Sequence, residues 1–176
     1  VLFTVPLILS GLFQQLFNWV DAFIVGNVEG ELALGGIGAT TALYNLFVTT
    51  IVGFTSGVSI LAAQKYGMGK KEELKGILSS FLCLLGGSFF IIALIGIAFA
   101  DSILMTLDTP AEIFSIGKEY LQILFMGVPF LAVYNTYSAV LRGLGDSRAP
   151  FLSVLVCSGM NLVLDILFVV IFRYGA

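Results

Sequence analysis

The sequence contains no histidine, and only 11% of its 176 residues are charged. Without an imidazole the chain cannot form a histidine-based catalytic triad or a histidine proton shuttle, and most zinc sites are excluded as well. Soluble domains of this size are about one quarter charged, so the shortage of charge excludes an ordinary cytosolic enzyme. The net charge of −3 is too small and too dispersed to indicate a nucleic-acid partner.

Cysteine is also scarce, since Cys83 and Cys157 are the only two in the sequence. Both lie within long apolar runs, where cysteine usually serves as a small buried hydrophobic side chain. We therefore expect both thiols to be buried, and the two residues indicate no redox compartment.

The sequence is instead rich in apolar residues, which make up 59% of the chain and raise its mean hydropathy to +1.06. Apolar stretches of about 20 residues are long enough to cross a bilayer as helices. The sequence has five of them, at approximately 2–26, 34–62, 76–100, 120–141 and 151–172. This pattern predicts an all-α fold, a polytopic transmembrane helical bundle with five spans.

The basic residues divide unequally between the loops that connect these spans. One side collects Lys65, Lys70, Lys71, Lys75, Arg142 and Arg148, whereas the other holds only Lys118 and Arg173. Because basic loops stay on the cytoplasmic side, the first set is predicted to face the cytoplasm. The first, third and fifth spans then run from inside to outside. We expect a multi-pass protein of the prokaryotic cytoplasmic (inner) membrane.

Two acidic residues, Asp21 and Asp165, lie within apolar stretches rather than in loops. An ionised carboxylate facing lipid costs several kcal/mol, so such residues normally face a protein interior or a hydrated cavity. Helical rise places both at roughly 7 to 11 Å below the outer boundary. The matched depth predicts that the two acids share one site.

Amide side chains accompany both acids at helical spacing. Gln14 and Asn18 precede Asp21 on one face of the first span, and Asn161 precedes Asp165 by about one turn in the fifth. Two carboxylates in a poorly hydrated site cannot both remain ionised cheaply, so we expect a proton or a Na⁺ to bind there. Oxygen ligands suit either ion, and the choice between H⁺ and Na⁺ stays open.

Two further polar stripes occupy the second and fourth spans. They consist of Thr41, Asn45, Thr49 and Ser56, and of Tyr134, Asn135, Tyr137 and Ser138. Such groups often hydrogen-bond between transmembrane helices, so interhelical contact and cavity lining both remain open. The candidate lining residues are Gln14, Asn18, Asn45, Tyr134 and Ser138. Gly53 and Gly57 form a G-x-x-x-G pair, which predicts close helix packing in the second span.

Pro6 lies in the first span, fifteen residues before Asp21. A proline removes one backbone hydrogen bond and kinks a helix. Pro6 is therefore a candidate bend whose angle could respond to the charge state of Asp21.

Together these elements form a recognisable order of motifs. Pro6 is followed by Asp21 with A-F-I-V-G at 22–26, then by L-R-G-L-G-D-S-R-A-P at 141–150 and N-L-V-L-D at 161–165. Over essentially the whole chain this order resembles the multidrug and toxic compound extrusion (MATE) family.

The resemblance implies a twelve-helix secondary antiporter built from two six-helix lobes. Such a protein is not an enzyme and needs no cofactor; it exports cationic or amphipathic drugs in exchange for H⁺ or Na⁺. Residues 1–176 would form an incomplete N-terminal lobe, whose partners are the small-molecule substrate, the lipid bilayer and the remaining helices of the transporter. In proteins of this kind Asp21, Asn161 and Asp165 would hold the proton or Na⁺, joined by Asn135 from the fourth span.

Three other functions of membrane proteins share some of these features. A lipid-linked oligosaccharide flippase of the same superfamily typically has a basic cavity, whereas no Lys or Arg lies within a predicted span here. An intramembrane aspartyl protease also uses two membrane aspartates, but G-L-G-D at 143–146 falls in a loop and Val20, not Tyr, precedes Asp21. A purely structural membrane subunit has no need of paired buried acids.

Overall fold

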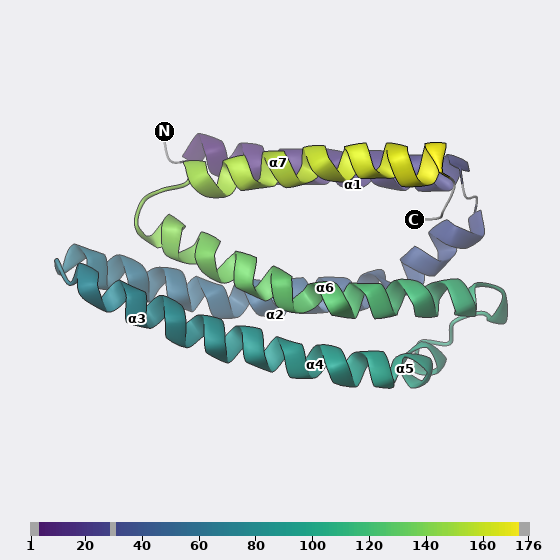
Figure 1. Cartoon of the computed structure of the whole chain (residues 1–176), viewed down its shortest axis with the longest axis horizontal. Helices are drawn as coiled ribbons and strands as arrows, with labels where there is room; N and C mark the ends of the chain where they lie inside the picture. Colours follow the sequence, from purple (N-terminus) through teal and green to yellow (C-terminus); the bar gives the residue numbers. More distant parts are fainter. Residues whose placement is uncertain (1–3, 29–30, 173–176) are drawn as a thin grey trace.

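The structure is a computed structural model that describes residues 4–28 and 31–172. Within these residues the chain is helical and contains no strand (Figure 1). The α-helices are α1 (Thr4–Val28), α2 (Glu31–Gly67), α3 (Lys71–Phe81), α4 (Gly87–Ala98), α5 (Ala100–Thr106), α6 (Ala111–Gly143) and α7 (Arg148–Asp165). Two π-helical segments, η1 (Leu82–Gly86) and η2 (Ile166–Ile171), follow α3 and α7.

Within the described residues five helices are long and apolar enough to cross a membrane, which confirms the predicted number of spans. They are Thr4–Ile24, Gly35–Gly67, Lys71–Ala98, Ala111–Gly143 and Arg148–Phe168. Several extend beyond the apolar stretches seen in the sequence. The fourth begins at Ala111 rather than near residue 120, because the polar turns that contain Glu112 and Glu119 are also helical. Hydropathy marks the part of a helix that fits the bilayer, whereas backbone hydrogen bonding continues past it.

The helices form three layers. α1 and α7 run side by side in the same direction, as Figure 1 shows at the top of the view. α2 and α6, also parallel to each other, share the most extensive contact in the molecule. The third layer is the continuous helix made by α3, η1 and α4, which packs against α6. The two predicted ion-binding spans, α1 and α7, are thus neighbours.

The hydrophobic core lies between α2, α6 and the third layer. One cluster joins Ile51 to Phe89 and Val128, and a second surrounds Leu121 and Phe125. The ring of Phe47 reaches Phe125 from α2, with centroids 5.4 Å apart in an edge-to-face arrangement. Because lipid tails are as apolar as these side chains, close packing rather than water exclusion holds such helices together.

Glycines permit two of the closest approaches. A β-carbon at Gly143 would overlap the main-chain oxygen of Ser59, and one at Gly96 would overlap the ring of Phe125. The G-x-x-x-G prediction is wrong for the described helices, since no atom lies within 4 Å of a β-carbon built at Gly53 or Gly57. Spacing alone did not identify which glycines face a neighbouring helix.

Large apolar side chains cover much of the outer surface. Trp19, Phe23 and Phe130 are 70%, 71% and 77% exposed. Cys83 and Cys157 are exposed as well, so the prediction that both are buried is wrong. Soluble proteins rarely expose so much apolar surface. Such a surface is suited to contact with lipid or with further helices.

The turn between α6 and α7 explains the conspicuous motif at 141–150. Gly145 has a φ of +87°, a conformation that side chains disfavour. The Asp146 carboxylate accepts hydrogen bonds from the main-chain N–H groups of Arg148 (2.9 Å) and Ala149 (3.2 Å). Pro150 follows in the first turn of α7, where a proline is tolerated. Asp146 therefore stabilises the start of a helix, which removes the support for a protease.

Candidate functional site

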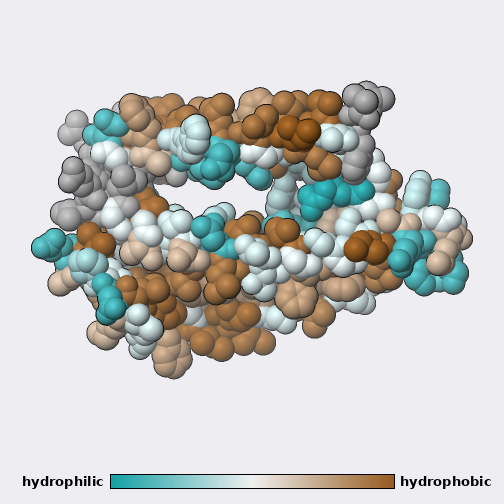
Figure 2. All heavy atoms as spheres, turned by 180° about the vertical axis from the view of Figure 1, so that it is seen from behind, coloured by the Kyte–Doolittle hydropathy of each residue, from teal (hydrophilic) through white to brown (hydrophobic). Residues whose placement is uncertain are grey.

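An opening separates the α1–α7 layer from the layer formed by α2 and α6. Figure 2 shows it passing through the molecule, with hydrophilic surface along the edge that the upper layer contributes. Polar surface at the centre of an otherwise apolar bundle is typical of a binding cavity. The predicted site residues lie on four helices, α1, α2, α6 and α7.

α1 and α7 bring the two predicted acidic positions to the same pair of helices. Their contact includes the rings of Phe13 and Phe151, whose centroids lie 6.3 Å apart. Asp21 lies seven residues before Val28 at the end of α1, and Asp165 is the last residue of α7. Since the helices are parallel, both positions lie toward the same end of the pair (Figure 1). The structure describes the backbone at Asp21 and Asp165 but not their side chains.

The amides that accompany the acids are accessible. Gln14 and Asn18 on α1, and Asn161 on α7, all have exposed side chains. Directly after Asp165 the helix changes from α to π geometry in η2. π-Helical turns recur at functional sites in helical proteins. Sequence reasoning missed this change of geometry because hydropathy does not distinguish the two kinds of helix.

Pro6 lies in the first described turn of α1. Its carbonyl oxygen accepts a hydrogen bond of 2.7 Å from the hydroxyl of Ser10. The hydrogen bond that a proline removes would have joined it to residue 2, which lies outside the described residues. The predicted bend at Pro6 is therefore still a prediction.

α6 contributes Asn135, whose side chain is half-buried. Its Nδ2 donates a hydrogen bond of 2.9 Å to the main-chain oxygen of Leu131, one turn earlier. That bond uses one of the two N–H groups of the amide and leaves its Oδ1 available as an acceptor. Tyr134 is also half-buried, whereas Ser138 is only 3% exposed. Asn135 and Ser138 lie on α6. Among the described residues no side-chain hydrogen bond links either of them to α1 or α7.

Two hydroxyl groups of the predicted α2 stripe bond within their own helix. Thr41 donates to the oxygen of Ile37 (3.0 Å) and Ser56 to that of Val52 (2.7 Å). These bonds satisfy the hydroxyls without a neighbouring helix, so the two groups are not interhelical bridges here. Asn45, the candidate lining residue of α2, is exposed.

A groove of about 330 Å³ lies between α2 and α6. It is lined by Tyr44, Tyr120, Ile123, Leu124, Gly127, Val128 and Leu131. Its surface is mostly apolar, with two tyrosines and, among the described residues, no basic side chain in the lining. Sequence analysis did not identify this groove, because its residues come from two spans and follow no polar pattern.

Comparison with known proteins agrees with this architecture. The profile of the MatE family matches residues 6–167. The probable multidrug resistance protein YoeA of Bacillus subtilis (strain 168) is 35% identical over 166 residues, which cover 93% of the chain and 35% of that protein. YpnP, a second probable multidrug resistance protein of the same organism, is 33% identical over 178 residues, covering 99% of the chain and 39% of its own length.

Solved structures show the same arrangement of helices. The crystal structure of MATE in complex with MaD3S superimposes with a TM-score of 0.90 at 24% identity. The match covers 97% of the chain and 38% of that structure. The chain thus spans between a third and two fifths of the length of the proteins that it resembles.

Proposed function

Because the chain belongs to the MatE family, we propose that it forms part of a secondary antiporter that exports cationic or amphipathic drugs in exchange for H⁺ or Na⁺. The chain itself is a multi-pass membrane protein, and its described residues include five helices long and apolar enough to cross a membrane. We propose that residues 1–176 belong to the N-terminal lobe of a two-lobe transporter in a prokaryotic cytoplasmic membrane. Further helices would cover the exposed apolar surface and close the opening between the layers.

The parallel packing of α1 against α7 carries this proposal. We assign the coupling ion to Asp21, Asn161 and Asp165, with the free amide oxygen of Asn135 as an additional ligand. A proton or Na⁺ on the acids neutralises charge that is costly at membrane depth. Binding that favours one arrangement of the helices shifts the populations of inward- and outward-facing states. Gln14, Asn18, Asn45, Tyr134 and Ser138 would line the adjoining cavity.

Two observations support an organic cation as the substrate. Relatives from Bacillus subtilis are described as probable multidrug resistance proteins. Tyr44 and Tyr120 line the groove between α2 and α6, whose surface is otherwise apolar. Aromatic faces attract cations while apolar side chains accept the body of the ligand.

A lipid-linked oligosaccharide flippase is less well supported. A pyrophosphate group requires basic side chains at its binding site. None of the described residues that line the groove is basic. The acidic positions on α1 and α7 also favour a positively charged ligand over an anionic one.

Efflux of a fluorescent organic cation from cells that express the full-length protein tests the proposal. Asp21→Asn and Asp165→Asn should each abolish gradient-driven efflux while leaving the amount of protein in the membrane unchanged. Asp146→Asn is the matched control, because it makes the same substitution in a cytoplasmic turn and should transport normally. Normal efflux in either membrane variant would contradict the assigned role.

A further inference from the structure

The turn between α2 and α3, at residues 65–75, carries the densest positive charge of the sequence. Its charged residues are Lys65, Lys70, Lys71, Lys75, Glu72 and Glu73. The turn lies at the end of the bundle where α6 also ends (Figure 1), and Figure 2 shows hydrophilic surface there, at the right of the view. Clusters of roughly four or more basic residues beside a membrane helix are typical of contact with anionic lipid.

Only part of this positive charge is neutralised within the protein. The Glu73 carboxylate pairs with Nζ of Lys65 (2.6 Å) and with Nζ of Lys70 (3.1 Å). Among the described residues no ion pair involves Lys71 or Lys75. These two lysines are one helical turn apart and share one side of α3, whereas Glu73, two residues from each, lies on the opposite side. One side of α3 therefore keeps an excess of positive charge.

The Lys71 side chain is held in place without losing its charge. Its Nζ lies 5.2 Å from the centre of the Tyr66 ring, near the end of α2. A cation–π contact of this kind restricts the side chain but does not neutralise the ammonium as a carboxylate would. Lys71 therefore remains available to an external anion.

α3 lies where the third span leaves the hydrocarbon region. Its apolar side chains are half-buried against α2 and α6, and among the described residues of α3 no large apolar side chain is exposed. Leu84 in η1 is 61% exposed, so the surface that faces lipid begins near η1. Helical rise places Lys75 about 10 Å along the helix from Leu82, the first residue of η1. The long side chain of Lys75 can therefore reach phospholipid headgroups.

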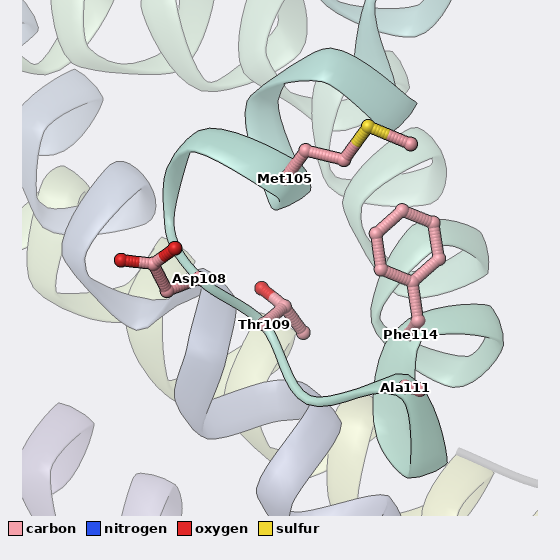
Figure 3. A pocket seen from close by; sticks show the side chains of 5 residues that line it. All are labelled: Met105, Asp108, Thr109, Ala111 and Phe114. Carbon is pink, nitrogen blue, oxygen red and sulfur yellow. The ribbon is translucent and has the colours of Figure 1, made fainter.

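The opposite end of the bundle does not suit an anion. Its acidic residues are Asp101, Asp108, Glu112 and Glu119. Lys118 at that end is paired with Asp101 at 2.8 Å. Figure 3 shows the turn between α5 and α6 there, where Asp108 has a φ of +51° and its carboxylate is directed away from Met105 and Phe114. An anionic headgroup would be repelled by these acids, so the charges favour the α2–α3 end.

We propose that Lys71 and Lys75 bind the phosphate of an anionic phospholipid such as phosphatidylglycerol, whose acyl chains lie along η1. The two ammonium groups donate to the phosphate oxygens. By the predicted topology this lipid belongs to the cytoplasmic leaflet. The excess of basic residues at this end attracts anionic lipid in general, whereas the unpaired lysines of α3 form a specific site. The proposal does not depend on antiport.

A fluorophore beside the site measures lipid binding to the full-length protein in detergent. Ser79→Cys, in a background without native cysteine, places an environment-sensitive label at an exposed position one turn from Lys75. Dioctanoyl phosphatidylglycerol should change its emission saturably. Dioctanoyl phosphatidylcholine has the same acyl chains with a zwitterionic headgroup and should not. Glycerophosphoglycerol is the anionic headgroup without acyl chains and should produce no saturable change either.

Adjacent lysines separate the specific site from general attraction. Lys71→Gln and Lys75→Gln should each raise the half-saturating concentration of dioctanoyl phosphatidylglycerol about fivefold, as expected for one basic residue at an anionic surface. Lys70→Gln removes the same charge from a lysine that is already paired with Glu73, and should leave the concentration nearly unchanged. Lys75→Arg keeps the charge and should bind like the wild type.

Several results would overturn the proposal. They are no saturable response to phosphatidylglycerol, or an equal response to phosphatidylcholine or to glycerophosphoglycerol. Equal effects of Lys70→Gln and Lys71→Gln would show a diffuse attraction and overturn it as well. Because binding is measured without an ion gradient, failure of antiport would leave this result unchanged, and failure of lipid binding would leave the antiporter standing.

Discussion

Gly143 of α6 lies directly against the main-chain carbonyl oxygen of Ser59 in α2, so close that a β-carbon at position 143 would overlap that oxygen. At the opposite end of the same pair, a β-carbon at Gly36 would lie 2.9 Å from Cγ2 of Ile116. The two parallel helices are therefore held together near both ends. α2 and α6 thus form a closely packed pair beside the α1–α7 pair.

Gly143→Ala should destabilise the protein by about 1–3 kcal/mol, because the added methyl group forces the helices apart. The loss of stability should lower the midpoint of thermal unfolding in detergent. Size-exclusion chromatography of heated samples measures that midpoint. Gly127→Ala is the matched control on the same helix, since no atom lies within 4 Å of its β-carbon. An equal midpoint in the two variants would show that the close approach does not limit stability.

Asp146→Ala should cost about 0.5–2 kcal/mol, because two N–H groups at the start of α7 lose their acceptor. Asp146→Asn keeps a side-chain oxygen and should retain most of the stability. Thermal unfolding of both variants measures the difference. If Asn were as destabilising as Ala, the charge and not the hydrogen bonds would account for the role of this residue.

Two methionines test the orientation in the membrane. Met68 lies within the basic turn at residues 65–75, and Met105 lies at the opposite end of the bundle (Figure 1); both are 67% exposed. In a background without native cysteine, Met105→Cys should react with an impermeant maleimide on intact cells, whereas Met68→Cys should react only after the membrane is permeabilised. The reverse pattern would place the basic turn outside and overturn the topology.

Asn135→Ala should raise the coupling-ion concentration needed for half-maximal transport several-fold, since the assigned site loses one oxygen ligand. Stability should change little, because Nδ2 bonds only to the main-chain oxygen of Leu131 among the described residues. Thr136→Val is the adjacent control, whose buried hydroxyl bonds to Ala132 at 2.8 Å. An unchanged ion dependence in Asn135→Ala would remove this residue from the site.

The sequence predicts the spans well because a membrane helix must be long and apolar whatever its neighbours are. The same constraint made Asp21 and Asp165 conspicuous, and in the structure the helices that carry them, α1 and α7, pack together. The segments between the spans were harder to predict. α5 and the polar first turns of α6 are helical, but they contain too few apolar residues to be recognised as helices from hydropathy.

Packing partners were harder to predict than helices. Gly143 and Gly53 look alike in the sequence, but only Gly143 faces another described helix. The exposure of Cys83 has the same origin, because an apolar residue in a membrane helix is equally at home facing lipid or protein. The turn at Asp108 depends on a φ value that no residue pattern reveals.

The most direct test of the central claim uses the full-length protein in proteoliposomes, with a pH gradient and a Na⁺ gradient imposed separately. We expect one of the two gradients to drive accumulation of a fluorescent organic cation in the wild type, and Asp165→Asn to lose the response to that gradient while still folding. Equal accumulation in wild type and variant, or accumulation that neither gradient alters, would contradict ion-coupled export through the α1–α7 site.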